Sequence, residues 1–211
     1  MAYPIARHIV FRIAKLWIRE VHGIENVPNN GPFIIAANHS SYFDHFCLGH
    51  VVIYKKNRYL HFLAKKEHFD TAFQRLWHRY SRAIPVDRES GGEDALKQAI
   101  SRLKGNAVIG IYPEGTRSLT GKIQKAKTGV ARLALGAKVP VVPVGLIGTF
   151  NILPKGRNIP KMKRAIVNIG RPISFDKYYG RKTTKRLLRE VTKCIMKEIA
   201  KLCGQKYRFR N

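Results

Sequence analysis

A histidine and an aspartate five positions apart, His39 and Asp44, lie in a polar stretch that follows an apolar run. Near neutral pH, histidine is the side chain best suited to accept a proton, and a carboxylate on its second ring nitrogen fixes the tautomer and stabilises the imidazolium. If the intervening residues turn from a strand into a helix, the two side chains can meet. The S-x-x-D spacing from Ser41 to Asp44 is also typical of a helix cap. The spacing alone therefore leaves both roles for Asp44 open, with capping the better role for Ser40 and Ser41.

Basic residues follow three later apolar runs. In Glu114-Gly115-Thr116-Arg117-Ser118, backbone N–H groups and the Thr116 hydroxyl can hold a phosphate, and the Arg117 guanidinium can bind it through two hydrogen bonds. An ordinary turn with a surface arginine is the alternative. Arg88 follows the run that ends at Val86, and Lys65 follows Tyr59–Leu63. Parallel strands bring such carboxyl ends to one edge, which predicts a phosphate pocket beside His39.

The elements that position these residues are read from the hydropathy pattern. Strands are predicted over Phe33–Ala37, Arg58–Leu63, Ala83–Val86, Ala107–Tyr112, Val139–Gly145 and Arg164–Ile169, and helices over Phe43–Tyr54, Glu67–His78, Glu93–Leu103, Thr128–Leu135 and Arg181–Leu202. Strands that alternate with helices indicate an α/β domain whose sheet is mixed but largely parallel and is flanked by helices. No repeat or linker marks a second domain, so we expect one domain over residues 21–211.

Residues 1–20 are expected to contain an amphipathic helix that precedes this domain. Ile5, Ile9, Ile13 and Leu16 share one stripe, and His8, Arg12, Lys15 and Arg19 lie on the other side. Such a helix can lie in a membrane interface, although most amphipathic helices cover a core of their own domain. No apolar run is long enough for an ordinary transmembrane helix. We therefore favour contact with a membrane surface.

The net charge of +27 predicts a partner that is an anion. Residues 151–211 alone hold 18 Lys and Arg against three acids, which favours anionic lipid. A basic nucleic-acid-binding protein is the alternative class, but no zinc-finger spacing, aromatic RNA-binding signature or helix-turn-helix is present, so no specific nucleic acid is expected. The three cysteines lack metal-binding spacing, so no metal site is expected, and inert thiols are the favoured interpretation.

Four segments in order resemble the motifs of the glycerolipid acyltransferase family. They are His39-x4-Asp44, Ile84-Pro85-Val86-Asp87-Arg88, Tyr112-Pro113-Glu114-Gly115-Thr116-Arg117-Ser118 and Val139-Pro140-Val141-Val142-Pro143-Val144. The resemblance extends over roughly residues 20 to 175 and is closest to 1-acylglycerol-3-phosphate (lysophosphatidate) acyltransferases. Ala64-Lys65-Lys66-Glu67 and Lys127-Thr128-Gly129 also look like family segments. The chain departs from the family in a short segment before the first motif and in Tyr112, where phenylalanine is common.

The resemblance implies a role for each motif residue. His39 would be the general base and Asp44 would orient it. Arg117 and Arg88 would bind the acceptor's phosphate with Gly115, Thr116 and, as a looser transfer, Lys65. Glu114 and Pro143 would support the motifs that contain them.

The implied reaction is transfer of a fatty acyl chain from a thioester of coenzyme A or acyl carrier protein to the free hydroxyl of lysophosphatidate. This reaction needs no bound cofactor and no acyl-enzyme intermediate. The expected place is the cytoplasmic face of the cell membrane, with an anionic lipid surface and, for one donor, acyl carrier protein as partners. Glycerol 3-phosphate, another lysophospholipid or an amine-linked lipid stays open as the acceptor, because the motifs contact only phosphate and hydroxyl.

Overall fold

The centre of the sheet is a strand buried on both faces. The computed structural model describes residues 6–66, 82–87 and 92–209, and in it Phe33–Ala37 forms β2 with all five side chains buried. So apolar a strand requires cover on both faces, which connecting helices supply in α/β proteins. The other strands are β1 (Ile18–His22), β3 (Leu60–Lys65), β4 (Ile84–Val86), β5 (Val108–Ile111), β6 (Val141–Ile147) and β7 (Ala165–Ile169).

The helical segments connect and cover these strands. The longer ones are α2 (Asp44–Gly49) continuing into η4 (His50–Lys55), α4 (Glu93–Lys104), α5 (Gly129–Ala137) and α6 (Lys185–Leu202). An N-terminal helical segment joins η1 (Ala6–Val10), α1 (Phe11–Ala14) and η2 (Lys15–Trp17). Short turns are η3 (Ile24–Asn26), η6 (Thr149–Asn151) and η7 (Asp176–Tyr178).

The seven strands form one mixed sheet in the order β1-β7-β6-β2-β5-β3-β4. β2 is parallel to both β5 and β6, β5 to β3, and β3 to β4. Among the described strands, only β6 and β7 form an antiparallel pair. The predicted α/β domain with a largely parallel mixed sheet is therefore confirmed, and β2, β5, β3 and β4 end at the same edge.

The predicted elements that lie in the described residues all form, with shifts at their ends. β2 has its predicted bounds, whereas β3 and β6 begin and end two residues later than predicted. α6 begins at Lys185 rather than Arg181, because the Thr184 hydroxyl caps it by accepting the N–H of Leu187 at 3.2 Å. The predicted helix Glu67–His78 lies outside the described residues.

A strand that the sequence did not indicate shortens the predicted N-terminal helix. The helix ends at Trp17 rather than at residue 19, because Ile18 begins β1, which pairs in parallel with β7. The helical pattern masked this strand, since Ile18 lies at helical spacing from Phe11 and Ala14.

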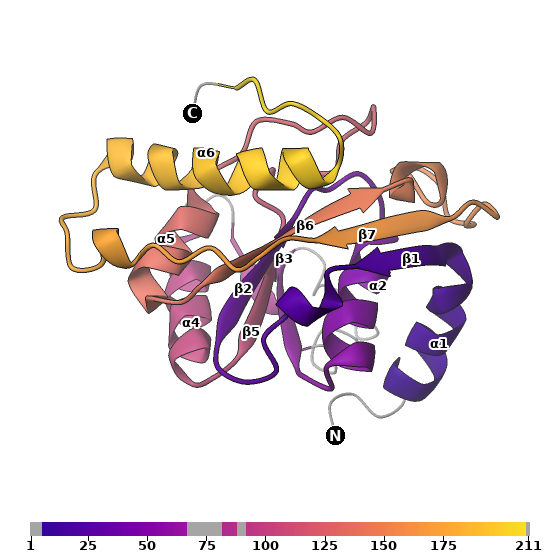
Figure 1. Cartoon of the computed structure of the whole chain (residues 1–211), viewed down its shortest axis with the longest axis horizontal. Helices are drawn as coiled ribbons and strands as arrows, with labels where there is room; N and C mark the ends of the chain where they lie inside the picture. The colour runs from indigo at the N-terminus through magenta and orange to yellow at the C-terminus, as the bar shows by residue number, and fades with distance from the viewer. Residues whose placement is uncertain (1–5, 67–81, 88–91, 210–211) are drawn as a thin grey trace.

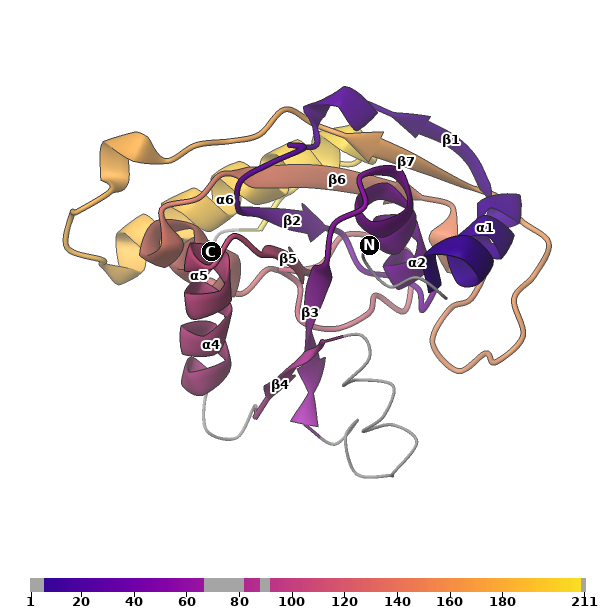
Figure 2. The same ribbon diagram turned by 90° about the horizontal axis from the view of Figure 1, so that it is seen from below.

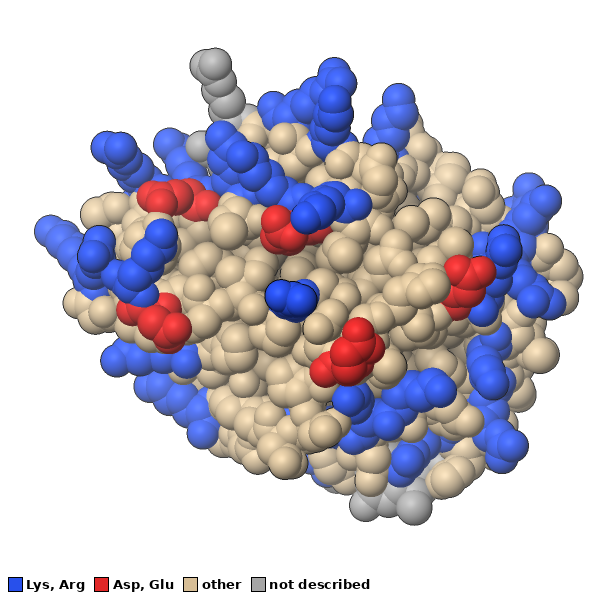
Figure 3. All heavy atoms as spheres, in the orientation of Figure 1, with Lys and Arg blue, Asp and Glu red and all other residues tan. Residues whose placement is uncertain are grey.

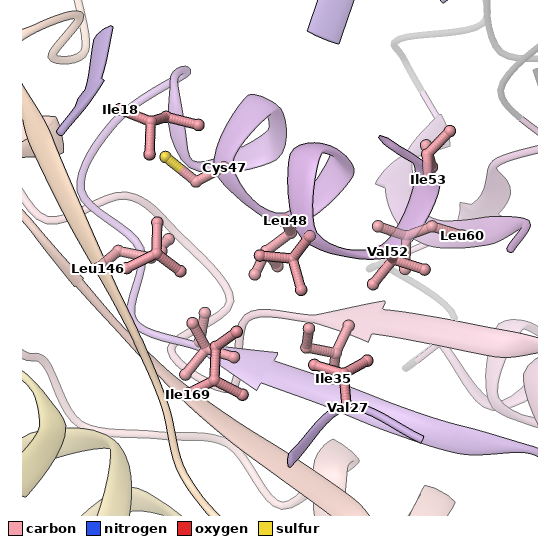
Figure 4. Packing of buried hydrophobic residues seen from close by; sticks show 14 of the residues in the cluster. Ile18, Val27, Ile35, Cys47, Leu48, Val52, Ile53, Leu60, Leu146 and Ile169 are labelled. Carbon is pink, nitrogen blue, oxygen red and sulfur yellow. The ribbon is translucent and has the colours of Figure 1, made fainter. Parts of the chain in front are cut away.

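Two hydrophobic cores lie on opposite faces of the sheet. Phe33, Ile35 and Ala37 of β2 point into one core with α1, α2 and η4, while Ile34 and Ala36 point into the other with α4, α5 and α6. Figures 1 and 2 show the two helical layers, and Figure 4 shows the first core, where Leu48 and Val52 lie over the sheet. Because alternate residues of a strand face opposite ways, one apolar strand serves both cores.

The N-terminal helix contacts the domain through residues outside its predicted apolar stripe. Phe11 and Ala14 are buried in the first core, whereas Ile9, Ile13 and Leu16 are 55%, 53% and 62% exposed. The helix is therefore apolar toward the core and also toward the outside. Within the described residues, none of the helices combines the length and the hydropathy that crossing a bilayer requires.

Candidate active site

His39 and Asp44 meet where β2 ends. The chain turns after Ala37 and enters α2 at Asp44, so His39 Nδ1 lies 2.8 Å from Asp44 Oδ2. The Asp44 side chain is fully buried, while that of His39 is 12% exposed. With Nδ1 held by the carboxylate, Nε2 is the ring nitrogen left to meet a substrate proton. The predicted pairing is present with a distance suited to a general base and its orienting carboxylate.

Asp44 holds the turn as well as the histidine. Its Oδ2 accepts the backbone N–H groups of Ser40 and Ser41, each at 2.8 Å. These donors precede the aspartate, and the N-cap of α2 has no side-chain hydrogen bond, so Asp44 does not cap the helix. The Ser40 hydroxyl bonds Thr149 and does not cap the helix. The Ser41 hydroxyl donates to Leu153 O and also accepts the N–H of Phe43, the residue directly before α2, at 3.0 Å, so Ser41 bonds the start of the helix as expected. One carboxylate thus fixes both the backbone and the imidazole.

A stack of rings supports His39 from one side. The Tyr112 ring lies parallel to the His39 ring, with centroids 3.9 Å apart and an interplanar angle of 9°. His45 stacks on Tyr112 and Phe62 in turn, and its Nδ1 is 2.7 Å from the Tyr112 hydroxyl. Burial, with a smaller contribution from Asp44, raises the pKa of Tyr112 well above its usual range. Tyr112 therefore acts as a neutral platform that positions His39.

Glu114 clasps the loop after β5 to the loop after β2. Its Oε1 accepts the backbone N–H of His39 at 2.9 Å, and its Oε2 accepts the backbone N–H of Gln124 at 2.9 Å. Burial raises the pKa of Glu114 to about 7, against the lowering effect of these hydrogen bonds. The supporting role predicted for Glu114 thus has a concrete physical form, since it fixes the backbone of the histidine itself.

Arg117 lies in the same clasped loop and presents an unsatisfied donor. The Ser118 N–H donates to His39 O at 2.8 Å, which brings this loop against the histidine. The Arg117 guanidinium stacks on the Tyr42 ring, with Cζ 3.5 Å from the centroid. Among the described residues its Nη1 is buried and has no hydrogen-bond partner. A buried N–H without a partner is costly, and an anionic ligand would satisfy it.

Gly115 and Thr116 shape the turn beside Arg117. Gly115 has a φ of +74°, which favours glycine, and its N–H closes the turn on Tyr112 O at 3.0 Å. The Thr116 carbonyl accepts from Gln124 at 3.0 Å and its side chain is exposed. A Cβ on Gly115 would lie 3.9 Å from Lys127 Nζ, so the ammonium of Lys127 lies over this turn. Lys127 is a candidate phosphate ligand that the sequence interpretation did not assign.

The other two predicted phosphate ligands are placed less closely. Lys65 is the last residue of β3 and pairs with Val86, so it lies at the edge where β2 and β5 also end. Arg88 lies outside the described residues, although β4 just before it ends at the same edge. Their contact with a phosphate stays a prediction.

Pro143 is buried inside β6, opposite Ala36 of β2. Its carbonyl accepts the N–H of Gly170 at 2.9 Å. Two positions after Ala36, the Asn38 side chain continues the β2–β6 pairing by bonding both the N–H and the carbonyl of Leu146, at 2.8 and 2.9 Å. Asn38 is thus the side chain that locks the catalytic turn to β6, and its position beside His39 was the only sequence signal for it.

The C-terminal residues hold the loop that follows Arg117. Gln205 Oε1 accepts the N–H of Ile123 at 3.0 Å, and the Tyr207 hydroxyl accepts the N–H of Ala126 at 3.1 Å. Cys203 Sγ lies 3.3 Å from Asn38 Oδ1. In the described part of the chain, no three His, Cys, Asp or Glu side chains are grouped as a metal site would require. The local chemistry is that of a well-supported base, His39, beside the basic side chains of Arg117 and Lys127.

Comparisons with known proteins agree with this geometry. A family model named Acyltransferase matches residues 18–147. A 1-acyl-sn-glycerol-3-phosphate acyltransferase of Bacillus subtilis is 32% identical over 154 residues, covering 73% of each chain. One from Streptococcus pneumoniae is 28% identical and aligns with 83% of this chain and 64% of its own length.

A solved structure extends the likeness to the fold. The 1-acyl-sn-glycerophosphate acyltransferase PlsC of Thermotoga maritima matches with a TM-score of 0.68 and 26% identity, over 96% of this chain and 83% of the other. The region that the family model matches contains the His39–Asp44 pair and the clasped Arg117 loop. This chain belongs to the acyltransferase family.

Proposed function

We propose that this protein transfers a fatty acyl chain from a thioester to the free hydroxyl of lysophosphatidate, which yields phosphatidate for phospholipid synthesis. The observation that carries the proposal is that an oriented base, His39, lies on a turn bonded to the loop of an arginine with an N–H group that is unbonded among the described residues. His39 is held by Asp44 at 2.8 Å, and the loop bonded to His39 carries Arg117, whose buried Nη1 has no hydrogen-bond partner in the described part of the chain. A hydroxyl and a phosphate on one small acceptor fit these two groups.

In the proposed reaction His39 Nε2 takes the proton of the acceptor hydroxyl. The hydroxyl oxygen attacks the thioester carbonyl, the C–S bond breaks, and the proton leaves with the thiol. Asp44 stabilises the imidazolium that forms between these steps. Arg117, with Lys127 and Lys65 at the same edge, binds the phosphate and so places the hydroxyl, which makes positioning a large part of catalysis.

The described nucleophiles favour direct transfer over an acyl-enzyme. The hydroxyls of Ser40 and Ser41 beside His39 are engaged with Thr149 and Leu153. Cys47 is fully buried, and burial raises its thiol pKa well above its usual range. None of these groups offers an activated nucleophile facing the edge where His39 lies.

We further propose that the enzyme works at the cytoplasmic face of the membrane, held by residues 1–20 ahead of an acyltransferase domain over 21–211. The support is the outward stripe of Ile9, Ile13 and Leu16, each more than half exposed. Exposed Arg12 and Lys15 accompany this stripe, and Figure 3 shows Lys and Arg far outnumbering acids along the edges of the molecule. Apolar residues beside bases suit an anionic interface.

The test is an acceptor panel in detergent with one acyl-coenzyme A, following release of the thiol. Lysophosphatidate should be acylated well above glycerol 3-phosphate and other lysophospholipids. Monoacylglycerol, which differs by the phosphate alone, is the matched control and should react poorly. Preference for another acceptor would reassign the substrate, and salt-sensitive binding to nucleic acid without thiol release would favour the nucleic-acid alternative.

A second comparison decides the donor. Acyl-coenzyme A and acyl carrier protein thioesters of the same chain length are assayed at matched concentration. Either result keeps the proposed chemistry, and a requirement for the carrier protein would add it as a protein partner.

A further inference from the structure

The connection between β6 and β7 projects two bare apolar side chains away from the domain. Residues 155–164 are all exposed, and Ile159 and Met162 are 76% and 79% exposed. Isolated apolar residues on a surface are normal, so these two alone indicate little. The neighbouring N-terminal helix and the surrounding bases are what suggest a role for them.

The connection is fastened to the N-terminal helix. Trp17 Nε1 donates to Lys161 O at 3.0 Å, and the N–H of Lys161 donates to Ile152 O at 2.9 Å. Ile152 is buried in the first core, so both the N–H and the carbonyl of Lys161 are bonded to parts of the protein that are packed in place. Figures 1 and 2 both place the connection and α1 at the same end of the molecule, where Ile9, Ile13 and Leu16 are also exposed.

Bases surround the exposed apolar side chains of the connection. Between Leu153 and Ala165 the chain has no acidic residue, and it carries Lys155, Arg157, Lys161, Lys163 and Arg164, all exposed. Within the described residues, none of these five has a carboxylate in ion-pair range. Apolar tips among unpaired bases match a bilayer that offers acyl chains below and phosphates at its surface.

The base of the connection is bonded to the catalytic turn. Leu153 O accepts the Tyr42 N–H at 3.0 Å and the Ser41 hydroxyl at 2.8 Å, and Ser41 pairs with Pro154 in a β-bridge. The ring of Tyr42 in turn supports the Arg117 guanidinium. The position of residues 154–164 is therefore coupled by direct hydrogen bonds to the turn that holds His39.

We propose that residues 154–164 are a second bilayer-inserting element, which dips Ile159 and Met162 into anionic phospholipid beside the N-terminal helix. Two separate insertions fix the tilt of the domain, which one helix alone cannot do. The sheet edge that carries Arg117 and His39 is then presented to acceptors that lie in the membrane. This inference rests on the proposed function for the identity of the acceptor, but the vesicle contact itself does not.

The first experiment measures cosedimentation of the full chain with vesicles of phosphatidylcholine and phosphatidylglycerol. The variant Ile159→Ser/Met162→Ser keeps the charge and should weaken binding about tenfold. The control is Gln98→Ser/Ser101→Ala, which changes two exposed, uncharged positions of α4 and should bind as the unaltered protein does. Equal binding by the 159/162 variant, or no binding by the unaltered protein, overturns the inference.

The second experiment reports insertion directly. Ile159→Trp should show a blue-shifted emission difference on adding the anionic vesicles, while Ser101→Trp on the exposed face of α4 should not. Duplex DNA is the comparison polyanion. An emission that stays unshifted on vesicles, or shifts equally on DNA, overturns insertion into lipid.

The third experiment separates this inference from the proposed function. The 159/162 serine variant should lose turnover of long-chain lysophosphatidate in vesicles, yet retain turnover of a short-chain acceptor dispersed in water. Equal loss on both acceptors would indicate damage to the site and contradict the inference. If the unaltered protein acylates neither, the proposed function fails, while the sedimentation and emission results still decide the membrane contact.

Discussion

The edge that carries His39 and the end that carries the N-terminal helix are built in opposite ways. Around His39, specific hydrogen bonds fix the backbone and the imidazole, as Asp44 Oδ2 shows with three bonding groups at 2.8 Å. At the other end, Ile13, Leu16 and Ile159 are more than half exposed and only a few hydrogen bonds tie the surface together. Chemistry depends on exact placement, whereas binding to a bilayer depends on a sum of small apolar and charge contributions.

This contrast predicts which substitutions act sharply and which act by degrees. At the catalytic edge, loss of a single interaction should have a large and selective effect on catalysis or substrate binding. At the membrane-facing end, single substitutions should have small effects that accumulate.

His39→Ala should lower kcat roughly 1,000-fold, because it removes the base that takes the acceptor's proton. Thiol release in detergent measures the loss. Circular dichroism and vesicle binding should stay unchanged, since His39 contributes little to either. Substantial turnover by this variant would contradict its assignment as the base.

Glu114→Gln should change how stability depends on pH. The pKa of Glu114 is raised from 4.5 to about 7 in the folded state, so the folded protein binds this proton more tightly than the unfolded chain. The resulting stabilisation is fully present below pH 4.5 and is lost as the pH rises to about 7. This change in the free energy of unfolding amounts to about 3 kcal/mol, and the glutamine variant should lack this dependence on pH.

Urea unfolding at several pH values measures this difference. Between pH 4.5 and 7, the stability of the unaltered protein should fall relative to that of the Glu114→Gln variant. Parallel pH profiles for the two proteins would show that Glu114 titrates as it does in the unfolded chain, and that its clasp on His39 carries no cost of burial.

Arg117→Ala should raise the KM for the acceptor by roughly 10- to 100-fold and leave the KM for the thioester nearly unchanged. Arg117→Lys should recover little, because an ammonium neither stacks on Tyr42 as a guanidinium does nor binds phosphate through two N–H groups. Steady-state kinetics with each substrate varied in turn makes the measurement. A selective loss of donor affinity would place the phosphate pocket elsewhere.

Tyr112→Phe should change kcat by no more than a few fold. It removes the hydroxyl that lies 2.7 Å from His45 but keeps the ring that stacks on His39. Tyr112→Ala is the more informative variant, since it removes the ring that stacks on His39 and should lower kcat with little effect on either KM. Equal kinetics for the two variants would show that ring stacking does not position His39.

Much of the fold could be predicted because its signals are local. The apolar run of β2 and the helical periodicity of α4 each lie within a few consecutive residues, and their observed bounds differ little from the prediction. β1 could not be predicted, because only Ile18 of its five residues is buried and its partner in the described sheet is β7, far along the chain. The Glu114 clasp was equally hidden, since it joins residues 75 positions apart.

The sequence by itself determined the identity of the chemistry. The order of the four motifs, the spacing from His39 to Asp44 and the arginine at position 117 are all local patterns in the chain. Tertiary structure decided how these residues work, because packing alone selects which groups become partners. It turned Asp44 toward the backbone of Ser40 and Ser41, buried Arg117 Nη1 without a partner and faced Leu16 outward. Hydropathy spacing shows that a helix has an apolar side, but only the packed core determines which apolar residues remain exposed.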